Sequence, residues 1–244
     1  MIPSRVDSLL NTPERRRTPG TFIVLEGGEG SGKTTQIKRL DCWLAAHPWF
    51  QILQAHYPHA EILTTREPGG TPIGQAIRKV LLDQNSDEVM QDRAELLLYA
   101  ADRAQHVESY LRPALIQGSI VLCDRYTDST VAYQGYGRGL DLGLIEQLNA
   151  IATGGLQSDL TLWLDVDVEI GLQRTKQRGS LDRLEQASLD FHQRVRAGFQ
   201  VLAHQYPKRI VRIDASLEPD QVAQQVQTVV MEHLQQWYPS FSNP

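Results

Sequence analysis

The sequence predicts an α/β domain built on a five-stranded parallel sheet that helices cover on both faces. Two observations predict it. Five short apolar runs are rich in β-branched residues and hydrophobic nearly throughout, which is the pattern of strands buried on both faces. Helical patterns lie between these runs, and strands that alternate with helices form parallel sheets. The expected strands are Thr21–Glu26, Glu61–Thr65, Ser119–Cys123, Leu160–Val166 and Arg209–Asp214.

Two helices are indicated by apolar stripes. After the first strand, Ile37, Leu40 and Leu44 recur every three or four residues, as on one face of a helix. After the last strand, a longer stripe begins behind the segment Glu218–Asp220, in which a proline lies between two acids, as at many helix starts. The apolar members of this second stripe are Val222, Val226, Val229, Val230, Leu234 and Trp237.

The expected domain spans residues 21–238. The preceding segment, 1–20, carries three consecutive arginines but lacks the apolar core of a secretion signal. We expect a disordered extension there, with a transit peptide as the alternative, and a short tail at 239–244. Within the domain, the stretch His47–His59 contains two prolines and is expected to be a connecting loop or a small insertion.

Size and composition set limits on function. The 244 residues suffice for one large domain, and 41% hydrophobic with 22% charged residues is an ordinary globular mix. The net charge of −5 does not indicate a nucleic-acid partner, so an anionic ligand must meet a local basic site. No apolar stretch approaches the roughly 20 residues of a membrane span, and we expect a cytoplasmic protein without a membrane partner. Cys42 and Cys123 lie in apolar runs without metal-ligand spacing, and we expect both thiols to be buried.

The segment Gly27–Thr34, between the first strand and the first helix, matches the phosphate-binding pattern G-x-x-x-x-G-K-S/T. Its glycines let backbone N–H groups point at phosphate oxygens, and the helix N-terminus adds positive potential. Lys33 is placed to reach the β- and γ-phosphates, and the Thr34 hydroxyl to hold Mg²⁺. We therefore predict an ATP site. Its residues are Gly27, Gly28, Glu29, Gly30, Ser31, Gly32, Lys33, Thr34 and Thr35.

This pattern alone does not separate a kinase from a GTPase, an ATPase motor or a sulfotransferase-like protein. Two other segments are expected at the same edge of the sheet. Asp124 closes the third strand, where a carboxylate linked to Mg²⁺ is expected, and Arg125 suits a bidentate grip on a monophosphate. Arg66 and Glu67 follow the second strand. A surface ion pair and a plain turn are the simpler explanations of these two segments.

Polar and aromatic side chains suitable for an acceptor pocket follow in two places. Tyr99 and Arg103 are four residues apart and therefore share one helix face, where a ring can stack on a base and a guanidinium can donate to its carbonyl. A core tyrosine beside a surface arginine is the commoner use of such a pair. After Asp124 and Arg125, hydroxyl and amide groups recur at helical spacing: Ser129, Thr130, Tyr133 and Gln134.

A basic segment follows the fourth strand. Residues 174–183 hold four basic residues and one acid, in a chain of negative net charge. With Gly179 as a hinge, the segment suits a lid over about 174–184 that brings a cation to the transferring phosphoryl group, whereas a solvated helix end is the alternative. The phosphate loop contains no arginine, so we look for that cation in the lid. The candidates are Arg174, Arg178 and Arg183.

In combination, these segments resemble the thymidylate kinase family over almost the whole chain, from about Thr21 to Trp237. They read Glu-Gly-Gly-Glu-Gly-Ser-Gly-Lys-Thr-Thr, Thr-Arg-Glu-Pro-Gly-Gly-Thr, Asp-Arg-Tyr-x-x-Ser-x-x-Ala-Tyr-Gln and Leu-Asp-Arg in the lid. The resemblance implies the P-loop nucleoside monophosphate kinase fold with a short lid, usually as a homodimer. It implies phosphorylation of dTMP to dTDP with ATP and Mg²⁺, for dTTP synthesis.

The resemblance also implies roles for matched residues. The implied catalytic residues are Lys33, Glu29, Arg125 and a lid arginine, with Arg178 favoured over Arg174 and Arg183. The implied dTMP-binding residues are Arg66, Glu67, Tyr99, Arg103, Arg125, Ser129, Thr130, Tyr133 and Gln134. The implied metal-linked residues are Thr34 and Asp124, with Glu67 near the metal or its waters.

Some of these roles are specific. Arg66 and Arg125 would hold the dTMP phosphate, and Arg103 would contact the thymine carbonyl. Tyr133 would crowd out a ribose 2′-hydroxyl. Tyr99 stands where the family often has phenylalanine, so its hydroxyl needs a partner or water. The alternatives are a kinase for another nucleotide, a P-loop ATPase or switch with a partner-binding role, and a non-catalytic paralogue.

Overall fold

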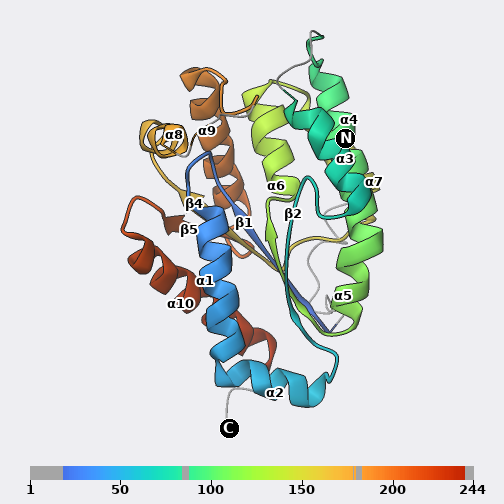
Figure 1. The fold of residues 1–244 in the computed structure, drawn as a ribbon, viewed down its shortest axis with the longest axis vertical. Helices are drawn as coiled ribbons and strands as arrows, with labels where there is room; N and C mark the ends of the chain where they lie inside the picture. The colour runs from blue at the N-terminus through green and yellow to red at the C-terminus, as the bar shows by residue number, and fades with distance from the viewer. Residues whose placement is uncertain (1–18, 84–87, 178, 180–182, 240–244) are drawn as a thin grey trace, which may run out of the picture.

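The computed structural model describes residues 19–83, 88–177, 179 and 183–239. At its centre lies a sheet of five parallel strands in the order β2-β3-β1-β4-β5 (Figure 1). Each strand agrees with a predicted one to within one residue at either end, which confirms the predicted fold class. The strands are β1 (Thr21–Glu26), β2 (Ile62–Arg66), β3 (Ile120–Asp124), β4 (Leu160–Asp165) and β5 (Ile210–Asp214).

Helical segments connect the strands. Two of them, η1 and η2, are π-helical and continue directly from α4 and α6. The α-helices are α1 (Lys33–Ala46), α2 (Pro48–His56), α3 (Pro72–Leu82), α4 (Asp92–His106), α5 (Arg112–Ile116), α6 (Thr127–Thr130), α7 (Leu142–Thr153), α8 (Val168–Lys176), α9 (Leu189–Gln205) and α10 (Pro219–Trp237). The π-helices are η1 (Val107–Leu111) and η2 (Val131–Gly137).

Both faces of the sheet are buried because successive side chains of a strand point to opposite faces. In β1, Ile23 and Leu25 pack in one cluster with α1, α2 and α10. Phe22 and Val24 point the other way and pack with η1 and α5. On that second face, Trp163 of β4 packs with α9 and η2. This two-sided burial is the physical reason why the strands are hydrophobic throughout.

The stretch 47–59 contains a helix, which corrects the expectation of a connecting loop there, whereas the alternative of a small insertion stays a prediction. Pro48 occupies the first turn of α2, where a missing N–H costs nothing, and His47 caps the helix through the N–H of Trp49. Trp49, Phe50 and Leu53 are buried in the main core cluster. The prolines thus mark the limits of a helix that packs beneath the sheet.

One of the two cysteines is not buried as expected. Cys123 is buried in β3, as predicted, but Cys42 is exposed. Cys42 lies two residues from both Leu40 and Leu44, which face the core. A separation of two residues places a side chain on the opposite side of a helix, so the apolar run did not imply burial there.

The order of the strands brings several loops to one edge of the sheet. All five strands are parallel, so their carboxyl ends meet at the same edge. The neighbours β1 and β3 lie at the centre, with the chain travelling to one side after β1 and to the other after β3. Crevices at such a reversal are the usual ligand sites of open α/β sheets.

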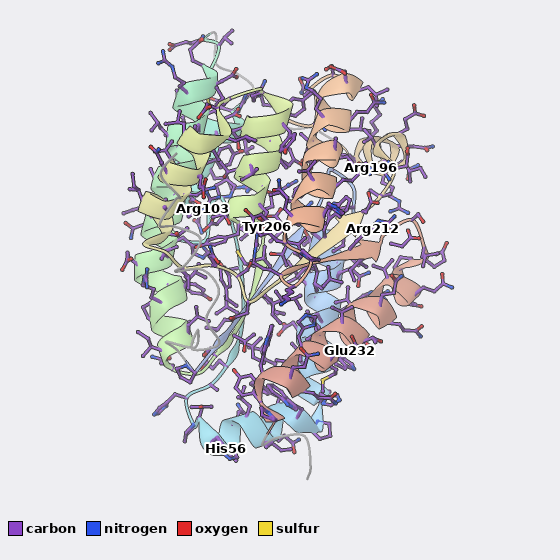
Figure 2. All side chains as sticks on the ribbon, turned by 180° about the vertical axis from the view of Figure 1, so that it is seen from behind. His56, Arg103, Arg196, Tyr206, Arg212 and Glu232 are labelled. Carbon is purple, nitrogen blue, oxygen red and sulfur yellow. The ribbon has the colours of Figure 1, made fainter. Side chains whose placement is uncertain are left out.

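Ion pairs also connect a helix and a neighbouring strand to this edge. Asp165, at the end of β4, pairs with Arg196 from α9 and with Arg212 from β5. Figure 2 labels the two arginines. Among the described residues, no helix has both the length and the apolar composition needed to cross a membrane.

Candidate functional site

A cleft of about 600 Å³ opens at the carboxyl ends of the strands. Its lining includes the phosphate loop after β1, the turn after β2, the segment after β3 and residues of α4. The sequence-predicted residues that line it are Glu29, Gly30, Ser31, Gly32, Lys33, Thr34, Thr35, Arg66, Glu67, Tyr99, Arg103, Asp124, Arg125, Ser129, Thr130, Tyr133, Gln134 and Arg174. The fold therefore places the two predicted sites in a single cavity.

The phosphate loop has the predicted backbone conformation. Gly27, Gly30 and Gly32 have φ values of 145°, 67° and 89°, which only glycine adopts readily. The loop also packs closely on α8, because a Cβ atom on Gly30 would lie 2.0 Å from the carbonyl oxygen of Gly171. The glycines are thus needed both for the turn and for the contact with the next element.

Lys33 lies over this loop. Its ammonium group donates to the carbonyl oxygens of Gly27 and Gly28, both at 3.0 Å, and to the Ser31 hydroxyl at 3.3 Å. Burial, and then the positive charge of Arg125, lower the pKa of Lys33. A phosphate group placed in the loop would favour the charged form, so the lysine is suited to an anionic ligand.

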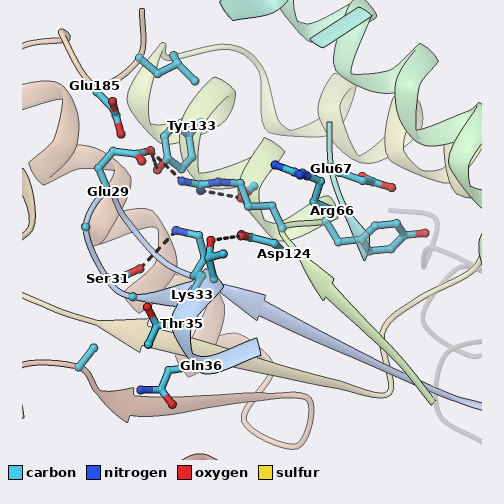
Figure 3. A pocket seen from close by; sticks show the side chains of 18 of the residues that line it. Glu29, Ser31, Lys33, Thr35, Gln36, Arg66, Glu67, Asp124, Tyr133 and Glu185 are labelled. Atoms are coloured by element: carbon cyan, nitrogen blue, oxygen red, sulfur yellow. Dashed lines mark hydrogen bonds and ion pairs between the residues drawn. The ribbon is translucent and has the colours of Figure 1, made fainter. Parts of the chain in front are cut away.

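Glu29, Arg125 and Tyr133 form a polar cluster in the lining of the cleft. Figure 3 labels Glu29 and Tyr133, whose side chains point toward each other. The Arg125 guanidinium donates to Glu29 Oε1 at 2.8 Å, and the Tyr133 hydroxyl donates to the same oxygen at 2.6 Å. Burial opposes ionisation of Glu29, but the charges of Arg125 and Lys33 outweigh it and lower the pKa to about 2. Glu29 is therefore a carboxylate at neutral pH.

Arg125 is held in place by more than Glu29. It has a φ of 71°, and its guanidinium also donates to Gly27 O and to Ser129 Oγ, each at 3.1 Å. It stacks over the Tyr133 ring, 4.7 Å from the ring centre. Backbone strain of this kind in a non-glycine residue is common at functional sites.

Thr34 and Asp124 offer oxygen atoms next to the phosphate loop. The Thr34 hydroxyl donates to Asp124 Oδ2 at 3.1 Å. The described part of the chain contains no group of three or more His, Cys, Asp or Glu side chains that could hold a metal ion. Mg²⁺ typically uses one or two carboxylate contacts together with substrate phosphates, so a hydroxyl and one carboxylate fit a metal that arrives with a nucleotide.

The acceptor side of the cleft is the part where the nucleotide that accepts the phosphoryl group is expected. The predicted base-binding residues lie there, and Arg103 and Gln134 each contact another polar side chain. Arg103 Nε donates to Glu67 Oε2 at 2.8 Å, and Gln134 donates to Glu95 Oε1 at 2.8 Å. Both carboxylate oxygens of Glu67 are engaged, by Arg103 and by His106. Glu67 thus faces a cation and a histidine, and its place near the metal or its waters stays a prediction.

The lid candidates have separate positions. Arg174, on α8, lines the cleft and donates to the carbonyl oxygen of Ala215 at 3.0 Å. Arg183 does not line it: this side chain donates to Leu81 O and pairs with the buried Glu95. Arg178 lies outside the described residues.

Several cleft or supporting residues were missed at the level of sequence. Asn149 of α7 accepts a hydrogen bond from Arg103, and the buried Glu26 accepts one from Ser129. Asn149 is an isolated polar residue in a helix without a motif, so no sequence signal marked it. Glu26 opens the segment that carries the family resemblance, but it comes before the phosphate-binding pattern at Gly27, and no role was assigned to it. The cleft lining also includes Gln36, Arg78, Leu184, Glu185, Ala215, Leu217, Glu218, Pro219 and Val222.

Comparison with known proteins agrees with this geometry. A family model described as thymidylate kinase matches residues 25–226. Thymidylate kinase from Cyanothece sp. (strain PCC 7425 / ATCC 29141) is 56% identical over 230 residues, which cover 91% of this chain and 98% of the relative. Thymidylate kinase from Thermosynechococcus vestitus (strain NIES-2133 / IAM M-273 / BP-1) is 57% identical over 219 residues, 90% of each chain.

A solved structure gives the same result. The crystal structure of thymidylate kinase from Ehrlichia chaffeensis superposes with a TM-score of 0.68 at 33% identity, and the match covers 86% of this chain and 98% of that chain. The family match spans both the phosphate loop and the acceptor side of the cleft. The chain belongs to the thymidylate kinase family.

Proposed function

We propose that this enzyme transfers the γ-phosphoryl group of ATP to dTMP, which gives ADP and dTDP. The observation that carries the proposal is a single cleft in which a phosphate loop faces a second set of basic and aromatic side chains. A P-loop ATPase or switch has no need of Arg66 and Arg103, which line the cleft outside the phosphate loop. A kinase requires such a second site.

On the donor side, the backbone N–H groups of the phosphate loop and Lys33 bind the ATP phosphates. Thr34 and Asp124, whose side chains are hydrogen-bonded to each other, would hold the Mg²⁺ that accompanies ATP. The metal supplies charge neutralisation at the β- and γ-phosphates when bound.

On the acceptor side, Arg66 and Arg125 bind the dTMP phosphate. The Arg66 side chain is exposed in the cleft and makes no hydrogen bond or ion pair with a residue that the structure describes. Tyr99 stacks on the thymine, and Arg103 donates to its carbonyl. Tyr133, which Glu29 holds through the hydroxyl, closes the space that a ribose 2′-hydroxyl would need.

The chemistry is direct in-line displacement. An anionic oxygen of the dTMP phosphate forms a bond to the γ-phosphorus as the bond from that phosphorus to the bridging oxygen of ADP breaks. No strong base is needed because the nucleophile is already ionised, so catalysis depends on positioning and on charge stabilisation. Arg125 contributes one fixed charge, and a lid arginine, with Arg178 favoured, contributes another.

A coupled ADP-release assay with ATP and Mg²⁺ tests the proposal. With dTMP, dUMP, TMP carrying ribose, dCMP and dAMP as acceptors, we expect clear preference for dTMP and loss of turnover when EDTA removes the metal. Some dUMP turnover is expected, because a single methyl group is worth only about 1–3 kcal/mol. Equal ADP release without an acceptor would point to an ATPase, and preference for a purine to another kinase.

We also infer that the enzyme is a homodimer. Exposed apolar side chains lie on three helices that pack side by side, α3, α4 and α7 (Figure 1). They include Ile73, Leu97 and Ile151, which are 57%, 56% and 77% exposed. A second copy would bury such side chains. The domain limits 21–238, the lid over 174–184 and the cytoplasmic location stay predictions.

A further inference from the structure

We propose that His106 is a positioning residue that, through Glu67, directs Arg103 at the base of the acceptor and so helps to set nucleotide specificity. The proposal rests on the proposed function, because it assumes that a pyrimidine nucleotide occupies this side of the cleft. It starts from a chain of four buried or half-buried polar side chains that reaches the cleft at Arg103.

The guanidinium of Arg103 is held by three acceptors from three parts of the fold. Its Nε donates to Glu67 Oε2 at 2.8 Å, one Nη to Asn149 Oδ1 at 2.8 Å and the other to the carbonyl oxygen of Tyr126 at 3.0 Å. The side chain is only 2% exposed, yet it lines the cleft. A guanidinium has five N–H groups, so two remain for a ligand.

Glu67 is the acceptor whose own orientation depends on His106. Its Oε1 lies 2.9 Å from His106 Nδ1, and His106 Nε2 lies 2.8 Å from Thr65 Oγ1. An ionised carboxylate only accepts hydrogen bonds, so Nδ1 must carry the hydrogen. In the neutral ring, Nε2 then accepts from the Thr65 hydroxyl, and one tautomer satisfies both contacts.

The surroundings of His106 leave it little freedom. Its side chain is 0% exposed, and its ring stacks on Tyr110 with the planes 19° apart. A Cβ atom on Gly70 would lie 2.6 Å from His106 Nε2, so the turn after β2 packs directly on the ring. His106 is also the last residue of α4, at the point where the helix becomes the π-helix η1. Such π-turns are frequent at functional sites.

Restraint of Arg103 affects which polar groups on the acceptor's base the site can bind. Thymine presents a carbonyl oxygen at position 4, whereas cytosine presents an amino group. The free N–H groups of a fixed guanidinium complement the carbonyl and oppose the amino group. A site built to hydrogen-bond one group can reject its counterpart by roughly 10⁴-fold, but only while the donor is held in direction. Glu67 and His106 provide that restraint.

Two variants of similar shape isolate the hydrogen bond. Asn and Leu both branch at Cγ, but only Asn carries an N–H donor where His106 has Nδ1. His106→Leu is expected to raise the KM for dTMP about tenfold or more and to lower the dTMP-to-dCMP ratio of kcat/KM at least tenfold, with the KM for ATP unchanged. His106→Asn is expected to stay within about threefold of wild type in all three quantities.

Controls separate this role from general loss of packing. Both variants lose the outer half of the ring and are expected to lower Tm by similar amounts, so Tm alone does not distinguish them. His233→Leu, on α10, removes a ring that bonds the carbonyl oxygen of Val229 and is expected to leave the acceptor KM unchanged.

If His106→Leu does not fold, Glu67→Gln is the second test, because an amide N–H would then face Arg103 or His106. It should raise the KM for dTMP and leave that for ATP unchanged.

The outcomes are distinct from those of the proposed function. If wild-type enzyme does not phosphorylate dTMP, the proposed function fails, whatever the variants do. If wild type is active and the Leu and Asn variants share the same KM for dTMP and the same dTMP-to-dCMP ratio, His106 has no positioning role and the inference is overturned. An equal rise in the KM for both substrates would overturn it as well.

Discussion

At the scale of single residues, Glu26 is a buried carboxyl group that supports the active-site wall. It ends β1 and is 0% exposed. It accepts from the N–H groups of Tyr126 and Ser129 and from Ser129 Oγ, at 2.8, 3.0 and 2.6 Å. Because Ser129 in turn accepts from Arg125, Glu26 orients the arginine through one intermediate side chain.

Burial and the nearby charge of Asp128 raise the pKa of Glu26 to about 7, although Arg125 opposes them. The folded protein therefore binds this proton more tightly than the unfolded chain, whose Glu has a pKa of 4.5. The resulting contribution to stability is complete below pH 4.5 and is lost as the pH rises through 7, with an upper limit of about 3 kcal/mol.

Glu26→Gln tests this linkage. The amide is neutral at every pH, so we expect the free energy of unfolding to fall less between pH 5 and pH 8 than it does in wild type. Denaturant titrations at several pH values measure the difference. Glu108→Gln, at an exposed ion pair with Arg112, is the control and should leave the wild-type pH profile intact. Parallel profiles for Glu26→Gln and wild type would contradict the raised pKa.

At the scale of elements, the contact between the phosphate loop and α8 determines the shape of the ATP site. Gly30 and Gly171 approach so closely that a Cβ atom on Gly171 would lie 2.3 Å from the carbonyl oxygen of Glu29. The obstacle is backbone, which cannot rotate away as a side chain can. Gly171 is therefore expected to be as important for the loop as the glycines within it.

Gly171→Ala should destabilise the protein by about 1–3 kcal/mol, the usual cost of overpacking, and raise the KM for ATP because the loop must move. Thermal unfolding and ATP titration measure the two effects. Gln173→Ala, an exposed position on the same helix, is the matched control and should leave both unchanged. A Gly171→Ala enzyme with wild-type Tm and wild-type ATP kinetics would show that the loop tolerates displacement.

At the scale of the whole molecule, the sheet and the exposed helix layer have different roles. The sheet gathers residues between Glu29 and Val222 in the sequence around one cleft. The layer formed by α3, α4 and α7 presents apolar side chains to solvent on the outside of the fold. The first arrangement places both proposed nucleotide sites within one chain, whereas the second is the observation behind the proposed dimer.

Sedimentation equilibrium tests the dimer. We expect wild type to have twice the 27.5 kDa mass of one chain. Leu97→Glu, which places a charge in the apolar layer of α4, should shift the protein toward the monomer because a charge is costly to bury unpaired. Tyr206→Glu changes an exposed aromatic residue at the end of α9 and should stay dimeric. A monomeric wild type at micromolar concentration would refute the dimer.

The sequence by itself determined the five strands, the phosphate loop and the residues that follow the strands. These depend on local patterns: a strand buried on both faces must be apolar at every position, and a loop that cradles phosphate must contain glycine at certain positions. The same logic failed for α2, whose prolines signalled a loop although they lie at the limits of a helix. It also failed for Cys42, because an apolar run does not tell which side of a helix faces the core.

Only the tertiary structure decided what each charged side chain does. Glu67 and His106 are 39 residues apart in the chain, and Glu26 and Ser129 are 103 apart, yet each pair is in hydrogen-bond contact. Arg183 resembles a catalytic lid residue in sequence but does not line the cleft and pairs instead with the buried Glu95. The physical reason is that hydrogen bonds and charge interactions depend on distance in space. A buried charge must find a partner, and packing between distant segments determines which one it meets.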